Sequence, residues 1–252
     1  YLKDVVVPAE LPPDMDSFKS QQHRWTKGSI QVCKKIFTDV WDSEESIPIK
    51  LEATAHLGSN FAYLLTLCTL VLMYPANFMF GNSWVKAVLV DIPVFFFASM
   101  SVILFYLTAQ GAQTRGGWWK TLPYLPLLLG LGIGMSINNG KAVIEALLGQ
   151  ESEFVRTPKY GVETKSQIRT QKRKYSAGKS LVLWLELGLA LYFLGMMVMA
   201  VVRHQWASLP FLGLFFFGFA YVSGGSLAKR LNLGAWFSNT PEDPPQPTVI
   251  AA

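Results

Sequence analysis

Five long blocks of apolar residues restrict the fold of this chain more than any other feature. They cover residues 53–74, 85–108, 121–148, 181–202 and 209–227. A helix needs about 20 mainly apolar residues to cross a bilayer, and soluble cores do not require runs of this length. Charged residues make up only 15% of the chain and gather between the blocks. The sequence therefore predicts a mainly α-helical, multi-pass transmembrane bundle over residues 53–227.

The block at 121–148 differs from the others because prolines, glycines, two asparagines and two charged residues interrupt it. The stretch 149–180 carries eight basic residues and 110–120 carries two, whereas 75–84 carries none. By the positive-inside rule, both basic stretches face the cytoplasm. A segment that joins them cannot cross the membrane once. We therefore predict that 121–148 is re-entrant or interfacial and that the other four blocks are crossings.

The net charge of +5 fits the membrane better than a nucleic acid. The basic residues flank apolar spans, where they set membrane orientation and contact lipid headgroups. Cys33 and Cys68 fall in different environments, and the three histidines are far apart along the chain. The sequence therefore predicts a lipid bilayer as a partner, no nucleic acid, no disulfide and no metal site in this chain.

A basic amphipathic helix is predicted at residues 16–41, with Asp16 as its N-cap. Apolar residues recur there at helical spacing, and lysines and arginines fill the remaining positions, as in helices that lie along a membrane surface. Residues 1–15 hold a β-branched run and a Pro-rich turn. This pattern predicts the tail of a soluble α/β domain whose main part precedes Tyr1. Residues 239–252 are Pro-rich and predicted to be disordered.

Within the predicted helix, Gln21, Gln22, Arg24 and Trp25 form a candidate binding face. Gln21 and Trp25 are four residues apart and share a side of the helix, with Arg24 beside them. An indole ring stacks on the apolar face of a sugar, and a guanidinium binds phosphate through two parallel hydrogen bonds. These groups suit a site that holds a sugar chain beside a nucleotide diphosphate. The same residues would also occur if the tryptophan were buried in an interface and its neighbours faced solvent.

Gln21, Arg24 and Trp25 match the Q-x-x-R-W signature of processive family-2 β-glycosyltransferases, such as cellulose, chitin, hyaluronan and mannan synthases. The wider run from Pro8 to Gly28 resembles the cellulose synthase-like glucomannan synthases. The resemblance implies that this helix lies at the membrane surface beneath a GT-A (α/β) catalytic domain. It also implies that Trp25 stacks on the terminal sugar of the acceptor, while the Gln and Arg side chains line the acceptor and diphosphate site.

A second motif lies in the predicted cytoplasmic loop at 149–180. The run from Phe154 to Gly161 is basic and contains a Pro turn, and contact with lipid headgroups would explain it. It also resembles the gating loop of these synthases, with Phe154, Thr157 and Lys159 at matching positions. Arg156 stands where the family has Val. The resemblance implies a lid that closes over the nucleotide sugar.

The resemblance further implies inverting transfer of a hexose from a nucleotide-diphosphate sugar to a growing β-glycan, with Mg²⁺ or Mn²⁺ as cofactor. The family's catalytic aspartates, including the general base, do not occur in this sequence and are expected before Tyr1. The chain alone is therefore expected to be inactive and to depend on an N-terminal catalytic domain. The resemblance places it in a plasma, inner or Golgi membrane.

Two other functions fit the same blocks: a non-processive transferase with a lipid acceptor, and a transport or scaffold subunit without chemistry. Two ionisable residues inside apolar blocks, Asp91 and Glu186, either line a polymer channel with Asn138 and Asn139 or lie near the membrane interface. Gly130, Gly132 and Gly134 are interpreted as a close helix contact, because no strand precedes them as a dinucleotide site requires.

Overall fold

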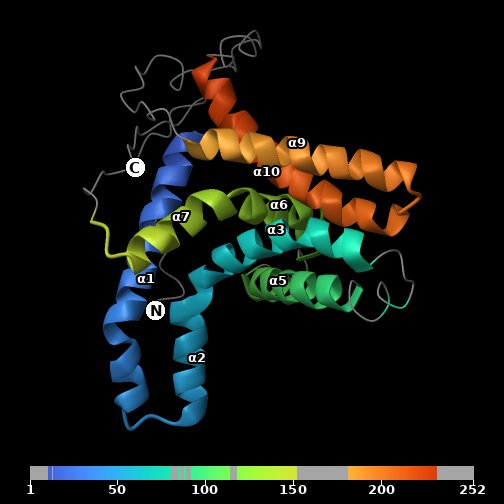
Figure 1. Ribbon diagram of the computed structural model, residues 1–252. Helices are drawn as coiled ribbons and strands as arrows, with labels where there is room; N and C mark the ends of the chain where they lie inside the picture. Colours follow the sequence, from blue (N-terminus) through green and yellow to red (C-terminus); the bar gives the residue numbers. More distant parts are fainter. Residues whose placement is uncertain are drawn as a thin grey trace, which may run out of the picture.

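The computed structural model describes residues 11–12, 14–80, 85, 88, 92–113, 118–151 and 181–231, and this part of the chain is mainly helical (Figure 1). Its α-helices are α1 (Met15–Asp42), α2 (Ile47–Gly58), α3 (Ala62–Phe80), α5 (Ile92–Gln113), α6 (Leu125–Gly134), α7 (Ser136–Leu147), α9 (Leu181–Val202) and α10 (Leu209–Arg230). Three short 3₁₀ segments precede α3, α6 and α10: η1 (Ser59–Phe61), η3 (Trp118–Tyr124) and η4 (Trp206–Ser208). The predicted mainly α fold is confirmed. Predictions for residues 1–10, Asp91, the loop at 152–180 and the tail at 239–252 lie outside the described residues.

Helix α1 lies across one end of the layer that α3, α6, α9 and α10 form (Figure 1). It packs against α7, α2 and α10. Its second half and α2 run side by side as an antiparallel hairpin that projects from the layer (Figure 1). A charged helix set across the ends of apolar helices is the arrangement expected of a surface helix on a membrane-embedded bundle.

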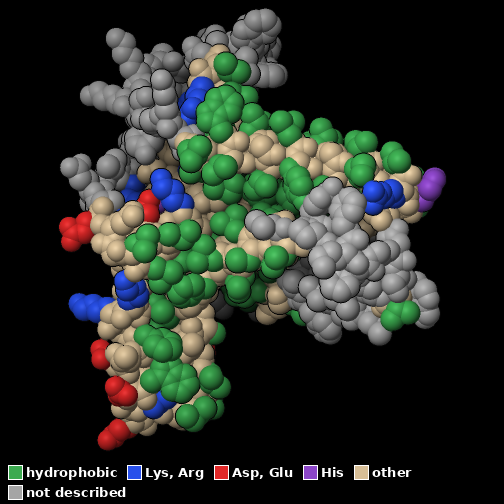
Figure 2. Space-filling model, viewed as in Figure 1, with side chains coloured by type: hydrophobic (Ala, Val, Ile, Leu, Met, Phe, Trp, Pro, Cys, Tyr) green, Lys and Arg blue, Asp and Glu red, His purple; other side chains and the backbone are tan. Residues whose placement is uncertain are grey.

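Helices α9 and α10 are both 22 residues long and apolar enough to cross a membrane. Charged side chains gather at the two ends of the visible face, over α1 and at the turn between α9 and α10, with apolar side chains between them (Figure 2). Large apolar side chains stay exposed along α9: Leu181, Trp184, Leu185, Leu191, Leu194, Val198, Met199, Val201 and Val202. A bilayer would cover this band, which is too extensive for a water-facing surface. The chain is therefore a membrane protein.

The predicted irregular block at 121–148 is divided into two helical pieces. The segment Trp118–Gly134 meets Ser136–Leu147 at a bend of 44°, and together they pass the length and composition test for a span. Such a bend is the geometry of a broken span or a re-entrant loop. The non-crossing path that we expect for this block stays a prediction.

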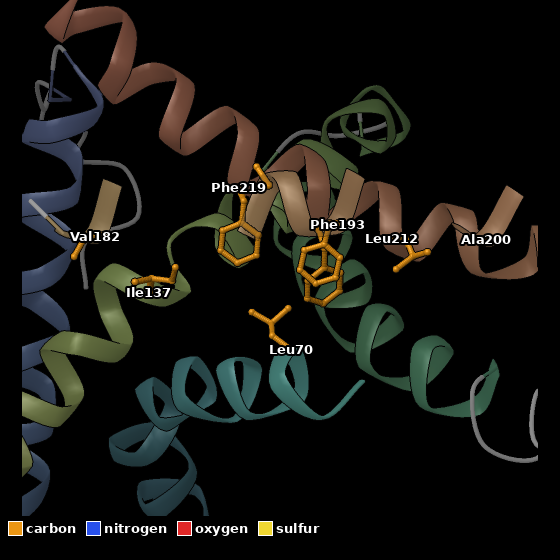
Figure 3. Close-up of a cluster of buried hydrophobic side chains, with 9 residues drawn as sticks. Leu70, Ile137, Val182, Phe193, Ala200, Leu212 and Phe219 are labelled. Carbon is orange, nitrogen blue, oxygen red and sulfur yellow. The ribbon is translucent and has the colours of Figure 1, made fainter. Parts of the chain in front are cut away.

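An aromatic cluster joins α9 and α10 (Figure 3). The ring of Phe193 lies 5.1 Å from that of Phe215 and 6.1 Å from that of Phe219, and all three side chains are buried. Leu70 of α3 and Ile137 of α7 belong to the same apolar cluster. Offset aromatic pairs stabilise contacts beyond their buried area, so this cluster holds the two spans together as a hairpin.

Helices α6 and α10 approach each other through glycines. A Cβ atom added at Gly134 would lie 2.2 Å from the Gly218 carbonyl oxygen, and one added at Gly218 would lie 2.3 Å from the Gly130 carbonyl oxygen. The same addition at Gly132 meets nothing within 4 Å. The predicted close helix contact is confirmed for Gly130 and Gly134, whereas Gly132 takes no part in it.

Two local predictions are wrong. Asp14, not Asp16, is the N-cap of α1, and its Oδ1 accepts a hydrogen bond of 2.9 Å from the Ser17 amide. An N-cap side chain accepts from the second or third amide of the helix, and Ser17 is the third residue after Asp14. Helix α3 also continues to Phe80 instead of ending before Pro75, and the predicted span at 53–74 is shared by α2, η1 and α3. Pro removes only one helical hydrogen bond, and apolar helices tolerate that loss.

Candidate functional site

Helix α1 has two chemically different sides. At 100° per residue, Lys19, His23, Lys27, Ile30 and Lys34 fall within an arc of about 80°, and Gln21 and Trp25 point the opposite way. Lys19, Lys27 and Ile30 are buried against the bundle, whereas the Trp25 side chain is 62% exposed. We call the first side the docked face and the second the open face. The docked face fixes how the open face is presented.

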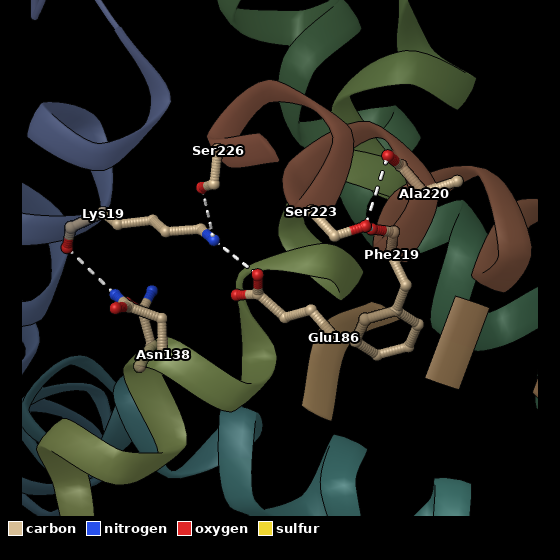
Figure 4. Close-up of polar contacts among 8 residues, drawn as sticks. Lys19, Asn138, Glu186, Phe219, Ala220, Ser223 and Ser226 are labelled. Atoms are coloured by element: carbon tan, nitrogen blue, oxygen red, sulfur yellow. Dashed lines mark hydrogen bonds and ion pairs between the residues drawn. The ribbon is translucent and has the colours of Figure 1, made fainter. Parts of the chain in front are cut away.

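At the start of the docked face, Lys19 enters the apolar bundle (Figure 4). Its Nζ forms an ion pair with Glu186 of α9 and donates a 2.9 Å hydrogen bond to Ser226 Oγ of α10. Asn138 of α7 donates a 2.9 Å hydrogen bond to the Lys19 carbonyl oxygen. Glu186 is fully buried, so its charge depends on these contacts with α1.

Further along the docked face, Glu145 of α7 collects three basic groups. Its Oε2 lies 3.2 Å from His23 Nε2 and 3.3 Å from Lys27 Nζ, and its Oε1 lies 3.6 Å from Lys141 Nζ. Lys27 is buried and Lys141 is mostly exposed. A carboxylate shared among several cations binds them more firmly than an isolated surface pair, because the charges form a network.

The two ends of α1's contact with the bundle are also fixed by polar bonds. Lys34 Nζ donates to the carbonyl oxygens of Ala146 and Leu147, at 3.2 and 2.9 Å. These groups belong to the last turn of α7, where a cation is favoured. At the other end, Lys229 of α10 lies 3.1 Å from the Asp14 carboxylate. Burial opposes ionisation there, but the bonds from Ser17 and Lys229 hold the Asp14 pKa below its usual value.

The open face carries the residues of the predicted binding motif. Gln21, Gln22 and Arg24 are half-buried, and Trp25 is exposed. A Cβ added at Gly28, one turn further on, would meet nothing within 4 Å. The structure therefore brings Gln21 and Trp25 to one uncovered surface, with Arg24 at its edge. The predicted lid residues Phe154, Thr157 and Lys159 lie outside the described residues, so their meeting with Trp25 stays a prediction.

The pKa of His23 is lowered from its ordinary value of 6.5. Burial is the largest cause, and the positive charges of Lys141, Lys27 and Arg24 act in the same direction, while Glu145 opposes them. A neutral His23 therefore suits the fold. Its contribution to stability is complete above about pH 6.5, the value for an unfolded chain, and is lost as the pH falls through the lowered pKa.

We expect the purified protein in detergent to lose thermal stability on acidification from about pH 7.5 to 5, through the range where an unfolded histidine titrates. A His23→Gln variant should lose less, because Gln keeps a polar contact with Glu145 and cannot take up the proton. Melting temperatures at several pH values measure this. The same substitution at the exposed His56 should leave the pH dependence as it is in the wild type. Identical slopes for wild type and His23→Gln would contradict this assignment.

The docked face is the part of the site that sequence reasoning missed. Lys19, His23 and Lys27 follow one another at four-residue spacing, which is a signal for one helix side. The spacing alone indicates a basic helix side and does not show what that side contacts. Glu186 forms an ion pair with Lys19, which its sequence position did not reveal. Its position in a channel or near the membrane interface stays a prediction. Asn138 and Asn139 are buried beside that pair.

The ligands of the implied Mg²⁺ or Mn²⁺ are not found in the part of the chain that the structure describes. Within the described residues, no group of three or more His, Cys, Asp or Glu side chains could hold a metal ion. The carboxylates of Glu186, Glu145 and Asp14 form ion pairs with lysines. The metal therefore enters none of the steps considered below.

The structure shows a helix with an exposed Trp25 and half-buried Gln21 and Arg24, docked on helices that are apolar enough to cross a membrane. These features agree with a membrane protein, and the curated relatives that this chain resembles are glycosyltransferases. The chain is 26% identical to glucomannan 4-beta-mannosyltransferase 7 of Arabidopsis thaliana over 180 residues, which is 68% of this chain and 30% of that protein. It is 26% identical to glucomannan 4-beta-mannosyltransferase 1 of Oryza sativa subsp. japonica, over 69% of this chain and 32% of that protein. The resemblance drawn from the motifs is thereby confirmed.

The chain spans about 30% of the length of the curated relatives it matches. No protein-family profile matches it, and no solved structure does. This segment is thus similar to part of proteins that are named as mannosyltransferases. The activity of the whole protein is proposed below.

Proposed function

We propose that this segment is the membrane-embedded part of an inverting glycosyltransferase, which transfers a hexose from a nucleotide-diphosphate sugar to a growing β-glycan. One observation supports the proposal most: Trp25 is exposed on a helix whose other face is held by ion pairs. Because the helix is fixed in this way, its backbone loses little conformational freedom when a sugar ring stacks on Trp25.

In this proposal, Trp25 binds the terminal sugar of the acceptor, and Gln21 with Gln22 donates and accepts hydrogen bonds at its hydroxyls. Arg24 lies where its guanidinium can neutralise a diphosphate leaving group. The acceptor hydroxyl gives its proton to a general base, for which we assign no residue in this chain. Thr157 and Lys159 would close over the nucleotide. The apolar helices would then guide the glycan through the bilayer.

An exposed tryptophan at a membrane surface has a second physical explanation, because indole rings also anchor proteins at the headgroup level. The chain offers a matched control for that role. Trp184 of α9 is 61% exposed, nearly the same fraction as Trp25, and it lies on an apolar span. If the two rings only anchor the protein at the membrane, replacing either one should have the same effect. If Trp25 binds sugar, only its replacement should lower activity.

We expect Trp25→Ala in the complete protein to lower transfer of radiolabelled mannose from a nucleoside-diphosphate mannose into polymer at least about tenfold, which corresponds to about 1.4 kcal/mol of lost stabilisation. Trp25→Tyr should recover much of the activity, because a second aromatic ring can stack on the sugar. Trp184→Ala should keep it. Normal incorporation by Trp25→Ala would rule out the acceptor site. If the labelled product is a lipid that carries a single sugar, the acceptor is a lipid and not a growing polymer.

A further inference from the structure

The contact between α1 and the spans is built around a buried charge pair whose purpose the proposed function does not explain. Lys19 and Glu186 are 167 residues apart in sequence, and both are buried. Ser226 accepts from the same ammonium, so α1, α9 and α10 meet at one point (Figure 4). Desolvation of two such charges opposes folding, so apolar residues of similar size would hold the helices together at least as well.

The surroundings of the pair are not arranged for maximal stability either. Among the described residues, four buried side-chain polar atoms have no hydrogen-bond partner: Glu186 Oε1 of the pair itself, Ser17 Oγ of α1, and Ser136 Oγ and Asn139 Nδ2 of α7. Each such atom costs free energy in a packed interior. Departures from good packing and pairing concentrate at functional sites. A buried charge pair is best attested as a device that selects one register between helices.

The geometry of α1 connects this pair with the open face. Lys19 and Trp25 are six residues apart on one uninterrupted helix, which corresponds to about 9 Å along the axis and about 120° around it. A rotation of α1 that separated Lys19 from Glu186 would turn Trp25 through the same angle. The network around Glu145 limits tilting further along, but its contacts to His23 and Lys141 are more exposed.

We propose that Lys19 and Glu186 form an ionic clamp that sets the rotation and height of α1 against α9 and α10, and so positions Trp25 and Arg24 toward the acceptor. The two residues act through Trp25 and are positioning residues. This inference rests on the proposed function for its effect on catalysis, while the effect on the position of the helix stands independently of it.

The double variant Lys19→Met/Glu186→Met tests the clamp, because it removes both charges and keeps apolar volume in their place. We expect it to fold, with a melting temperature in detergent close to that of the wild type. Its kcat/KM for a short β-manno-oligosaccharide acceptor should fall about 100-fold, the loss that a misplacement near 1 Å can cause. The KM for the nucleotide sugar should change much less. A purely structural pair would leave both constants unchanged.

Spin labels measure the position of the helix without any need for activity. Gly28→Cys on α1 and Gly224→Cys on α10 suit this purpose, since an added Cβ meets nothing within 4 Å at either position. Cys33 and Cys68, both free, are first replaced with Ser and Ala. The distance distribution between the labels should shift or broaden in the double Met variant. The control Lys141→Met, which breaks an ion pair with an exposed lysine, should leave it unchanged.

The outcomes separate the clamp from the proposed function. A double Met variant with wild-type label distances and wild-type acceptor kinetics would overturn the clamp. If Trp25→Ala incorporates sugar normally while the label distances still shift, the acceptor site is wrong and the clamp stands as a positioning device. If Trp25→Ala is impaired while the double Met variant keeps wild-type kinetics and wild-type label distances, the acceptor site stands and the clamp is wrong.

Discussion

Replacing Gly134 with Ala is expected to destabilise the contact between α6 and α10 strongly. The new Cβ would lie 2.2 Å from the Gly218 carbonyl oxygen, 2.7 Å from its carbonyl carbon and 2.6 Å from Val222 Cγ2. The first two are backbone atoms of α10, so relief requires the whole helix to move. Overpacking of this kind costs about 1–3 kcal/mol or more, which exceeds the gain of about 1 kcal/mol from replacing a helical glycine with alanine.

Gly132→Ala is the matched control for this prediction. It lies in the same helix, two residues away, and its added Cβ meets nothing within 4 Å. Only the propensity gain applies there, so the melting temperature in detergent should stay the same or rise slightly. Gly218→Ala should behave like Gly134→Ala, because its Cβ would lie 2.3 Å from the Gly130 carbonyl oxygen. Equal melting temperatures for Gly132→Ala and Gly134→Ala would show that α6 and α10 do not touch as described.

The second large effect is expected when only one member of the Lys19–Glu186 pair is removed. Lys19→Met leaves the fully buried Glu186 without its cation, and loss of one partner from such a pair typically costs about 3–5 kcal/mol. Glu186→Met leaves a buried ammonium with Ser226 as its remaining hydrogen-bond acceptor among the contacts described here. Both single variants should therefore unfold at clearly lower temperature or denaturant concentration than the wild type.

Removing both charges should restore most of that stability, because no buried charge is left uncompensated. Chemical unfolding of the wild type, both single variants and the double variant forms a double-mutant cycle. With single losses of about 3–5 kcal/mol each and little loss in the double variant, the expected coupling is about 6 kcal/mol or more and favours the intact pair. Additive losses in the double variant would mean that Lys19 and Glu186 do not meet in the folded protein.

Much of the candidate site could be predicted from residues that are close together in the sequence. Helical spacing alone predicts that Gln21 and Trp25 share a face, and the structure places them together on the open side of α1. The start of α1 was misplaced by two residues because Asp14 and Asp16 are both plausible caps, and only the contact with Ser17 distinguishes them. The signal for the docked face was present at Lys19, His23 and Lys27, but its anionic partners lie more than a hundred residues away.

Composition and helical spacing are sufficient to show that this protein is helical and membrane-embedded, and that one side of its first helix carries Gln, Arg and Trp. Those properties depend on the composition and spacing of residues close together in the chain, and water and lipid act on them directly. The contacts of Lys19 with Glu186 and of Gly134 with Gly218 could be found only in the folded structure. Which helices pack together depends on the fit of whole surfaces, and the spacing of residues within one helix does not specify its partner.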